Sequence, residues 1–110
     1  MSQKNYEDYK EGVRRARRCD WQLGELLNQK RQSKDFCEGV VIGYLGVIET
    51  DPQSLKEADI DNMMNALKQL PEKDQDRLMK ELIKITTIYE DKIPPTTLRM
   101  IENKKKEIFK

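Results

Sequence analysis

Apolar side chains recur along the first part of this chain with the three-to-four-residue spacing of an α-helix. The spacing continues from about Tyr6 to Lys30 without a proline. It therefore predicts one long amphipathic helix over 6–30. At about 100° per residue, its apolar face carries Tyr9, Val13, Ala16, Cys19, Leu23, Leu26 and Leu27.

The segment Phe36–Ile48 is apolar almost all round. This pattern predicts a helix that is buried on most sides and stands at the centre of a bundle. Its glycines, Gly39, Gly43 and Gly46, fall on one narrow stripe, which lets a second helix backbone approach closely. A strand is the alternative, because valine and isoleucine are frequent here. We prefer the helix, with Ser33 or Asp35 as its cap.

Prolines divide the rest of the chain into three more helices. Asp51-Pro52 ends the buried segment, and Pro71 closes a third helix and opens a fourth. Ser54 followed by Glu57 fits a capping box at the start of the third helix. The sequence thus predicts an all-α fold, a compact bundle of about five helices in a single domain over 1–110.

The last predicted helix follows Pro94-Pro95, with Thr96 or Thr97 as its cap. Its apolar spacing is interrupted by Lys104, Lys105 and Lys106. Residues 94–110 are therefore expected to form a frayed end or a terminal helical arm that docks on a neighbour.

Composition narrows the class of protein only modestly. Lys and Arg total 21 against 20 for Asp and Glu. This balance argues against a surface that coats nucleic acid everywhere, but it allows a local basic patch. No apolar run approaches the ~20 residues of a membrane span, and the polar N-terminal residues lack a signal-peptide core. We expect a cytoplasmic protein with no membrane association.

Residues that commonly carry catalysis or bind metals are scarce. The chain has no histidine, the commonest general base and transition-metal ligand. Cys19 and Cys37 lack zinc-site spacing and lie in apolar patterns, so we expect buried free thiols. We therefore expect no enzyme, no cofactor and no metal. The alternative is an enzyme that uses the carboxylates of Asp59 and Asp61. Stabilisation of the fold by added metal ions would indicate it.

Four arginines occur within five residues: Arg14, Arg15, Arg17 and Arg18. On a continuous helix, three of them lie opposite the apolar face. Trp21, the only tryptophan, then lies beside Arg17 and Arg18, because residues three and four apart are neighbours on a helix. We take these five residues as the candidate partner-binding site.

An arginine–tryptophan patch has two functional interpretations. Both residue types are enriched at protein-binding hot spots, which favours a non-enzymatic protein–protein interaction module such as an adaptor, inhibitor or regulatory subunit. The alternative is a nucleic-acid-binding regulator or a small subunit of a nucleoprotein complex, in which guanidinium groups hold phosphates and the ring stacks on a base.

A purely structural interpretation also stays open. Trp21 would then face another helix or a second subunit, and the arginines would form solvated ion pairs with Glu7, Asp8, Glu11 or Glu25. Formation of a homo-oligomer is a further expectation, because a small core gains much from a second copy.

Overall fold

The computed structural model describes residues 5–20, 22–29 and 31–108. The described residues form α-helices and one short 3-10 helix, with no strand. The all-α fold class is confirmed, and so is the helical interpretation of Phe36–Ile48, but the described residues form six α-helices where about five were predicted. The elements are α1 (Tyr6–Arg17), α2 (Gln22–Gln29), α3 (Lys34–Thr50), η1 (Pro52–Ser54), α4 (Glu57–Lys68), α5 (Glu72–Tyr89) and α6 (Pro95–Ile108).

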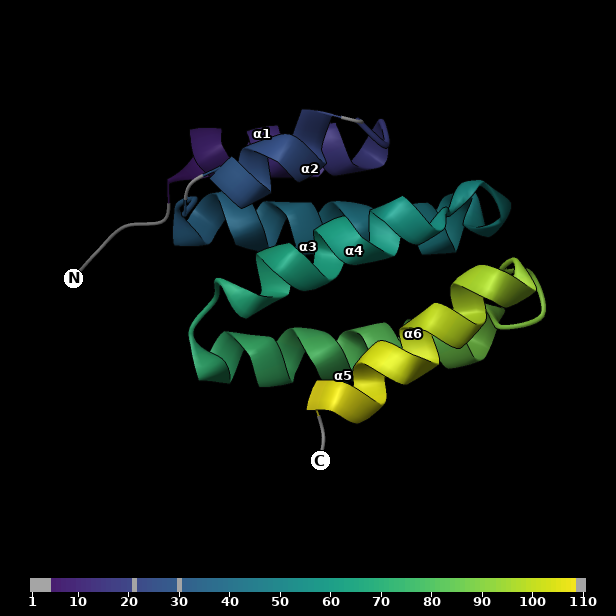
Figure 1. The fold of residues 1–110 in the computed structure, drawn as a ribbon. Coiled ribbons are helices and arrows are strands. Elements are labelled where there is room, and N and C mark those ends of the chain that lie inside the picture. The colour runs from purple at the N-terminus through teal and green to yellow at the C-terminus, as the bar shows by residue number, and fades with distance from the viewer. Residues whose placement is uncertain (1–4, 21, 30, 109–110) are drawn as a thin grey trace.

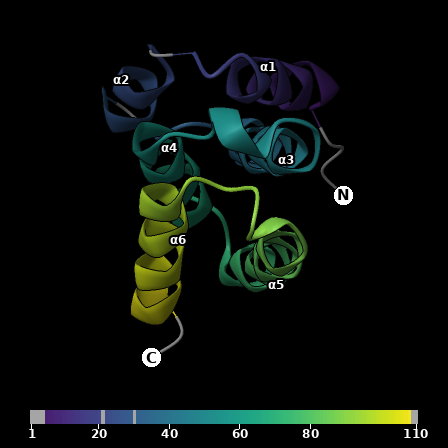
Figure 2. The same cartoon turned by 90° about the vertical axis from the view of Figure 1, so that its right-hand side faces the viewer.

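The helices are stacked as three consecutive pairs, α1–α2, α3–α4 and α5–α6 (Figure 1). Viewed from the side, α1, α3 and α5 form one layer and α2, α4 and α6 form the other (Figure 2). Within the layers, α1 packs on α3 and α3 on α5, while α2 packs on α4 and α4 on α6. α-Solenoid proteins stack helix pairs in the same way, and their aligned helices form extended binding surfaces.

Polar contacts fix the direction of the helices in the first layer. The Asn5 amide donates to Asp35 Oδ2 at 2.7 Å, which holds the starts of α1 and α3 together. Lys34 lies 3.5 Å from Asp74, which does the same for α3 and α5. The three helices therefore run parallel, and their side-chain stripes lie side by side.

The contact between α1 and α3 depends on small residues. A Cβ on Gly43 would lie 2.7 Å from both Ala16 Cβ and the Val13 carbonyl oxygen. Gly12 and Gly39 leave even less room, because each lies against the backbone of the opposite helix. The predicted role of the glycine stripe, to admit a second helix backbone, is confirmed for Gly39 and Gly43, whereas Gly46 lies against the Arg17 side chain.

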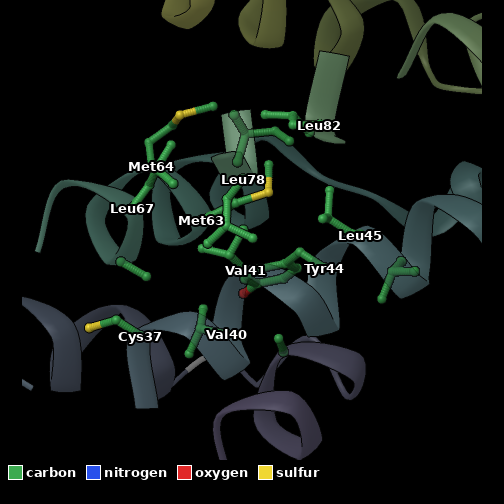
Figure 3. Packing of buried hydrophobic residues seen from close by; sticks show 14 of the residues in the cluster. Cys37, Val40, Val41, Tyr44, Leu45, Met63, Met64, Leu67, Leu78 and Leu82 are labelled. Atoms are coloured by element: carbon green, nitrogen blue, oxygen red, sulfur yellow. The ribbon is translucent and has the colours of Figure 1, made fainter. Parts of the chain in front are cut away.

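Helix α3 forms the centre of the core, as the sequence predicts. Side chains from α4 and α5 converge on it (Figure 3). Tyr44 is fully buried, and its hydroxyl accepts a hydrogen bond from Asn62 Nδ2 at 3.2 Å. The residues labelled around α3 in the close view are Met63, Met64, Leu67, Leu78 and Leu82.

The prediction of one unbroken helix over 6–30 is wrong, because α1 ends at Arg17 and α2 begins at Gln22. Cys19 adopts a left-handed conformation with φ 52°. The Cys19 amide donates to the Ala16 carbonyl at 3.0 Å and the Asp20 amide to the Arg15 carbonyl at 3.1 Å. These two bonds form a Schellman motif, which terminates a helix.

Asp20 lies in the turn after α1, where the chain leads into α2. Its Oδ1 accepts a hydrogen bond from the Gln22 amide at 2.9 Å, at the beginning of α2. The apolar spacing continues across the break, with Leu23 and Leu27 still buried. These two side chains therefore enter the core from α2, which packs on α4 in the second layer.

Of the predicted caps, only the one at α3 is confirmed. Ser33 Oγ accepts from the Phe36 amide at 3.2 Å. The capping box of Ser54 and Glu57 is wrong, because α4 begins at Glu57 itself. There the Asp59 carboxylate accepts from the Lys56 amide at 2.9 Å instead.

The predicted cap of the last helix is also wrong. Helix α6 begins at Pro95, before Thr96 and Thr97. Thr97 is buried, and its hydroxyl donates to the Leu55 carbonyl oxygen at 3.0 Å, which fastens α6 to the segment before α4. Proline suits this first position, because the first amides of a helix have no intrahelical acceptor.

None of the helices formed by the described residues combines the length and apolar character needed to cross a bilayer.

Candidate protein-binding groove

The arginines near the end of α1 lie on two sides of the helix. Arg15 lies on one side and contacts Asp20 at 3.4 Å. The other three arginines lie around a shallow surface hollow of about 410 Å³. The hollow is lined by Tyr9, Lys10, Val13, Arg14, Arg17 and Arg18.

Glu11 neutralises part of this charge. It accepts hydrogen bonds from Arg14 Nε at 3.1 Å and from Arg15 Nε at 2.9 Å. The hydrogen bonds from Arg14 and then Arg15 lower the pKa of Glu11 below its usual value. Arg14 and Arg15 therefore form ion pairs within the chain, as the structural interpretation of the arginines expects.

Arg17, Arg18 and Lys10 differ from this pair. Within the described part of the chain, none of the three forms an ion pair. The Arg17 guanidinium lies across α3, with Nε 3.3 Å from the point that a Cβ on Gly46 would occupy. Three exposed cations thus follow one edge of α1 without a matching acid among the described residues.

Trp21 lies outside the described residues. Its proposed position beside Arg17 and Arg18 requires helical spacing from residue 17 to residue 21. The continuous helix assumed there ends within the described residues, since α1 ends at Arg17 and Cys19 is left-handed. Of the five sequence-predicted site residues, Arg14, Arg17 and Arg18 line the hollow, whereas Arg15 lies on the other side of α1.

A larger feature, which we call the α1–α3–α5 groove, lies next to this hollow. It has a volume of about 620 Å³ and crosses the outer face of the first layer. Each helix contributes one stripe of side chains at helical spacing. The stripes are Tyr9, Val13 and Arg17 from α1; Ile42, Leu45, Gly46, Glu49 and Thr50 from α3; and Arg77, Leu78, Glu81 and Ile85 from α5.

The groove has an apolar floor and charged edges. Val13, Ile42 and Ile85 are only partly buried, so their apolar surface remains open to a partner. Arg17 lies at the α1 edge of the groove. Two exposed acids also line it, Glu49 near the C-terminal end of α3 and Glu81 on α5. Among the described residues, neither acid forms an ion pair.

Sequence reasoning missed this groove because it assigned Val13 and Ile85 to buried helix faces. One signal was present: the segment 36–48 is apolar almost all round. Such a helix needs neighbours on nearly every side to be fully buried. Ile42 accordingly lies on the side of α3 that no other described helix covers.

The two cysteines of the chain are free thiols, Cys19 partly buried and Cys37 buried. Burial and the neighbouring Asp59 carboxylate raise the pKa of Cys19 to about 11, and burial alone raises that of Cys37 to about 11. Both thiols are therefore protonated and weakly nucleophilic near neutral pH. In the described ranges, no three cysteine or carboxylate side chains cluster as a metal site would require.

Asp59, half of the carboxylate pair considered above, is buried and caps α4. Asp61 is exposed, two residues further along the same helix. Asp59 thus has a structural role, since its oxygen satisfies an amide of the first helical turn.

Compared with protein-family models, curated proteins and solved structures, the chain matches none of them. Function is therefore inferred from the groove and its charges.

Proposed function

We propose that this protein is a small non-enzymatic binding module, an adaptor, inhibitor or regulatory subunit, that holds a partner protein in the α1–α3–α5 groove. One observation carries the proposal: three parallel helices leave a groove of about 620 Å³ whose floor is apolar and whose edges are charged. An apolar centre with a polar rim is the usual composition of a protein-binding surface.

The aligned helices add support. Proteins built from stacked helix pairs bind partners across the face on which one helix of each pair is exposed. Here α1, α3 and α5 form that face, and α3 is stiffened by a buried core on its other side. A rigid surface loses little conformational entropy on binding.

Nucleic acid is the competing partner, and the cations Lys10, Arg17 and Arg18 favour it. Glu49 and Glu81 oppose it, because both carboxylates face the groove that a phosphate backbone would follow. Repulsion between like charges makes this groove poorly suited to a polyanion. We therefore rank a protein partner first.

The test is selection of binding peptides from a displayed library on the immobilised protein, followed by affinity measurement on two variants. Ile85→Asp puts a charge in the groove, whereas Ile88→Asp is a matched change on the same helix. Ile88 is 60% exposed and does not line the groove. Selected peptides should bind the wild type and Ile88→Asp equally, and should bind Ile85→Asp at least tenfold more weakly, the ~1.4 kcal/mol expected from losing one apolar contact.

Equal binding to both variants would show that the groove is not the site. Oligonucleotide binding that falls steeply with salt, together with the absence of any groove-dependent peptide, would replace the proposal with the nucleic-acid function. Both variants must retain the wild-type melting temperature within a few degrees for the comparison to count.

A further inference from the structure

On the basis of this proposed function, we propose that the groove binds one amphipathic α-helix of the partner protein. The edge of that helix facing α1 carries acidic residues, and the edge facing Glu49 and Glu81 carries basic ones. The proposal specifies the conformation, the apolar pattern and the charge order of the bound segment.

A helix fits the floor of the groove better than an extended chain does. Val13, Ile42 and Ile85 offer no hydrogen-bonding groups. Thr50, at one end, already donates its hydroxyl to the Gly46 carbonyl oxygen at 2.8 Å. An extended peptide would leave its backbone amides and carbonyls unpaired on this floor, whereas a helix satisfies them internally.

The dimensions also suit a helix. The α3 stripe extends from Ile42 to Thr50, which is ~12 Å at 1.5 Å per residue. A partner helix of about three turns would cover this length and lie between α1 and α5. Its apolar residues would recur at i, i+3 or i+4, and i+7, the pattern of helix-in-groove recognition.

The charges assign the two edges of the partner helix. Along α1, Lys10, Arg17 and Arg18 form no ion pair among the described residues. Glu49 and Glu81 are likewise without one in the described part of the chain. Arg77, the cation on the α5 side of the groove, is already paired with Glu38 and Asp74. A helix with acids toward α1 and a basic residue toward Glu81 therefore neutralises the charges that remain, whereas lysines on both edges bring like charges together along α1.

Three synthetic peptides of about 18 residues test the proposal, a length at which an isolated helix can form. All carry the same leucine stripe. The first has glutamates on one edge and lysines on the other, in the order proposed here. The second has lysines on both edges, so that it meets like charge along α1 in either chain direction, and the third is the first with a central proline. Binding is measured by fluorescence anisotropy at low and high salt.

The first peptide should bind about tenfold more tightly than the second, because each of roughly three exposed ion pairs adds a factor of about two. This ratio should shrink at high salt. The proline peptide should bind at least tenfold more weakly, because proline breaks the helix. The double variant Arg17→Glu with Arg18→Glu should reverse the preference, and Arg99→Glu on α6 should preserve it.

The failures are distinguishable. If the first two peptides bind equally and Ile85→Asp weakens both, the charge order is wrong while the groove remains the site. Equal or tighter binding by the proline peptide overturns the helical conformation alone. If no peptide responds to Ile85→Asp, both this proposal and the proposed function fail. Light scattering shows whether the protein forms a dimer and whether the peptides dissociate it. If they do, the groove binds a second copy of this chain, and the proposal is overturned.

Discussion

Gly43 of α3 faces Ala16 of α1 so closely that a Cβ on Gly43 would lie 2.7 Å from the Cβ of Ala16. The Val13 carbonyl oxygen lies at the same distance from that point. Because one of these neighbours is backbone, neither helix can accommodate a methyl group without shifting. The position of α1, and with it one wall of the groove, therefore depends on the absence of a side chain at residue 43.

Gly43→Ala should lower the free energy of unfolding by about 1–3 kcal/mol, the usual cost of overpacking, although alanine favours a helix by ~1 kcal/mol. Chemical denaturation measures this change. Gly46→Ala is the matched control on the same helix. There the nearest atom is Arg17 Nε at 3.3 Å, on a flexible side chain that can move. Its stability should stay unchanged or rise, and a loss equal to that of Gly43→Ala would contradict the close-contact argument.

The turn between α1 and α2 gives a prediction of opposite sign. Cys19 is the residue after the cap of the Schellman motif and has φ 52°, a conformation that costs a side-chain-bearing residue roughly 1–2 kcal/mol. Cys19→Gly should therefore be more stable than Cys19→Ala by about 1 kcal/mol. Both variants remove the thiol, so their difference isolates the backbone. Equal denaturation midpoints would show that the turn is not strained.

The parts of the fold that could be predicted from the sequence depend on local patterns. Phe36–Ile48 is apolar on all sides, and prolines at 52, 71 and 95 flank the later helices. The break at Cys19 could not be predicted in this way, because apolar spacing continues from Ala16 to Leu23 across it. No glycine or proline marks the turn. Asp20, a good N-cap residue, was the one available signal.

The groove depends on tertiary geometry that periodicity does not contain. Val13 and Ile85 follow the same helical spacing as fully buried neighbours such as Ala16 and Leu82. Whether such a position is covered depends on which helices lie beside it. The arginines were found from their density, but the unbroken helix from which their grouping with Trp21 was argued ends at Arg17.

The buried thiols make stability depend on pH in the alkaline range. Burial raises the pKa of Cys37 from its ordinary value near 9 to about 11, so the folded state retains a proton that the unfolded chain loses. This contribution is fully present below about pH 9 and is lost as pH rises toward 11. Cys37→Ala should make the fall in unfolding free energy over this range shallower, by up to ~1.4 kcal/mol per pH unit.

The measurement for this prediction is a series of urea denaturations between pH 8 and about pH 11. The slope decides the outcome, because the cavity left by alanine lowers stability at every pH. A residual slope should remain, since burial also raises the pKa of Cys19 to about 11 and raises that of Tyr44. If Cys37→Ala has the wild-type slope, the thiol does not titrate in this range.

Two adjacent threonines on α5 offer an internally matched comparison. Thr86 is buried, and its hydroxyl has no hydrogen-bond partner among the described residues. Thr87 is exposed, and its hydroxyl donates to the Ile83 carbonyl oxygen at 2.8 Å. Thr86→Val replaces the buried hydroxyl with a methyl group of similar size. It should therefore raise the free energy of unfolding by about 1–2 kcal/mol, because an unpaired buried hydroxyl is costly.

Thr87→Val should give no such gain, since it removes a satisfied hydroxyl from an exposed site. Thermal or urea denaturation of both variants, compared with the wild type, measures the contrast. A loss of stability in Thr86→Val would mean that the Thr86 hydroxyl is hydrogen-bonded. The simplest partner would be a water molecule between α5 and α6. The cavity of about 80 Å³ beside Thr86 is large enough to hold one. A gain confined to Thr86→Val would establish the hydroxyl as an unsatisfied group that weakens the contact between these two helices.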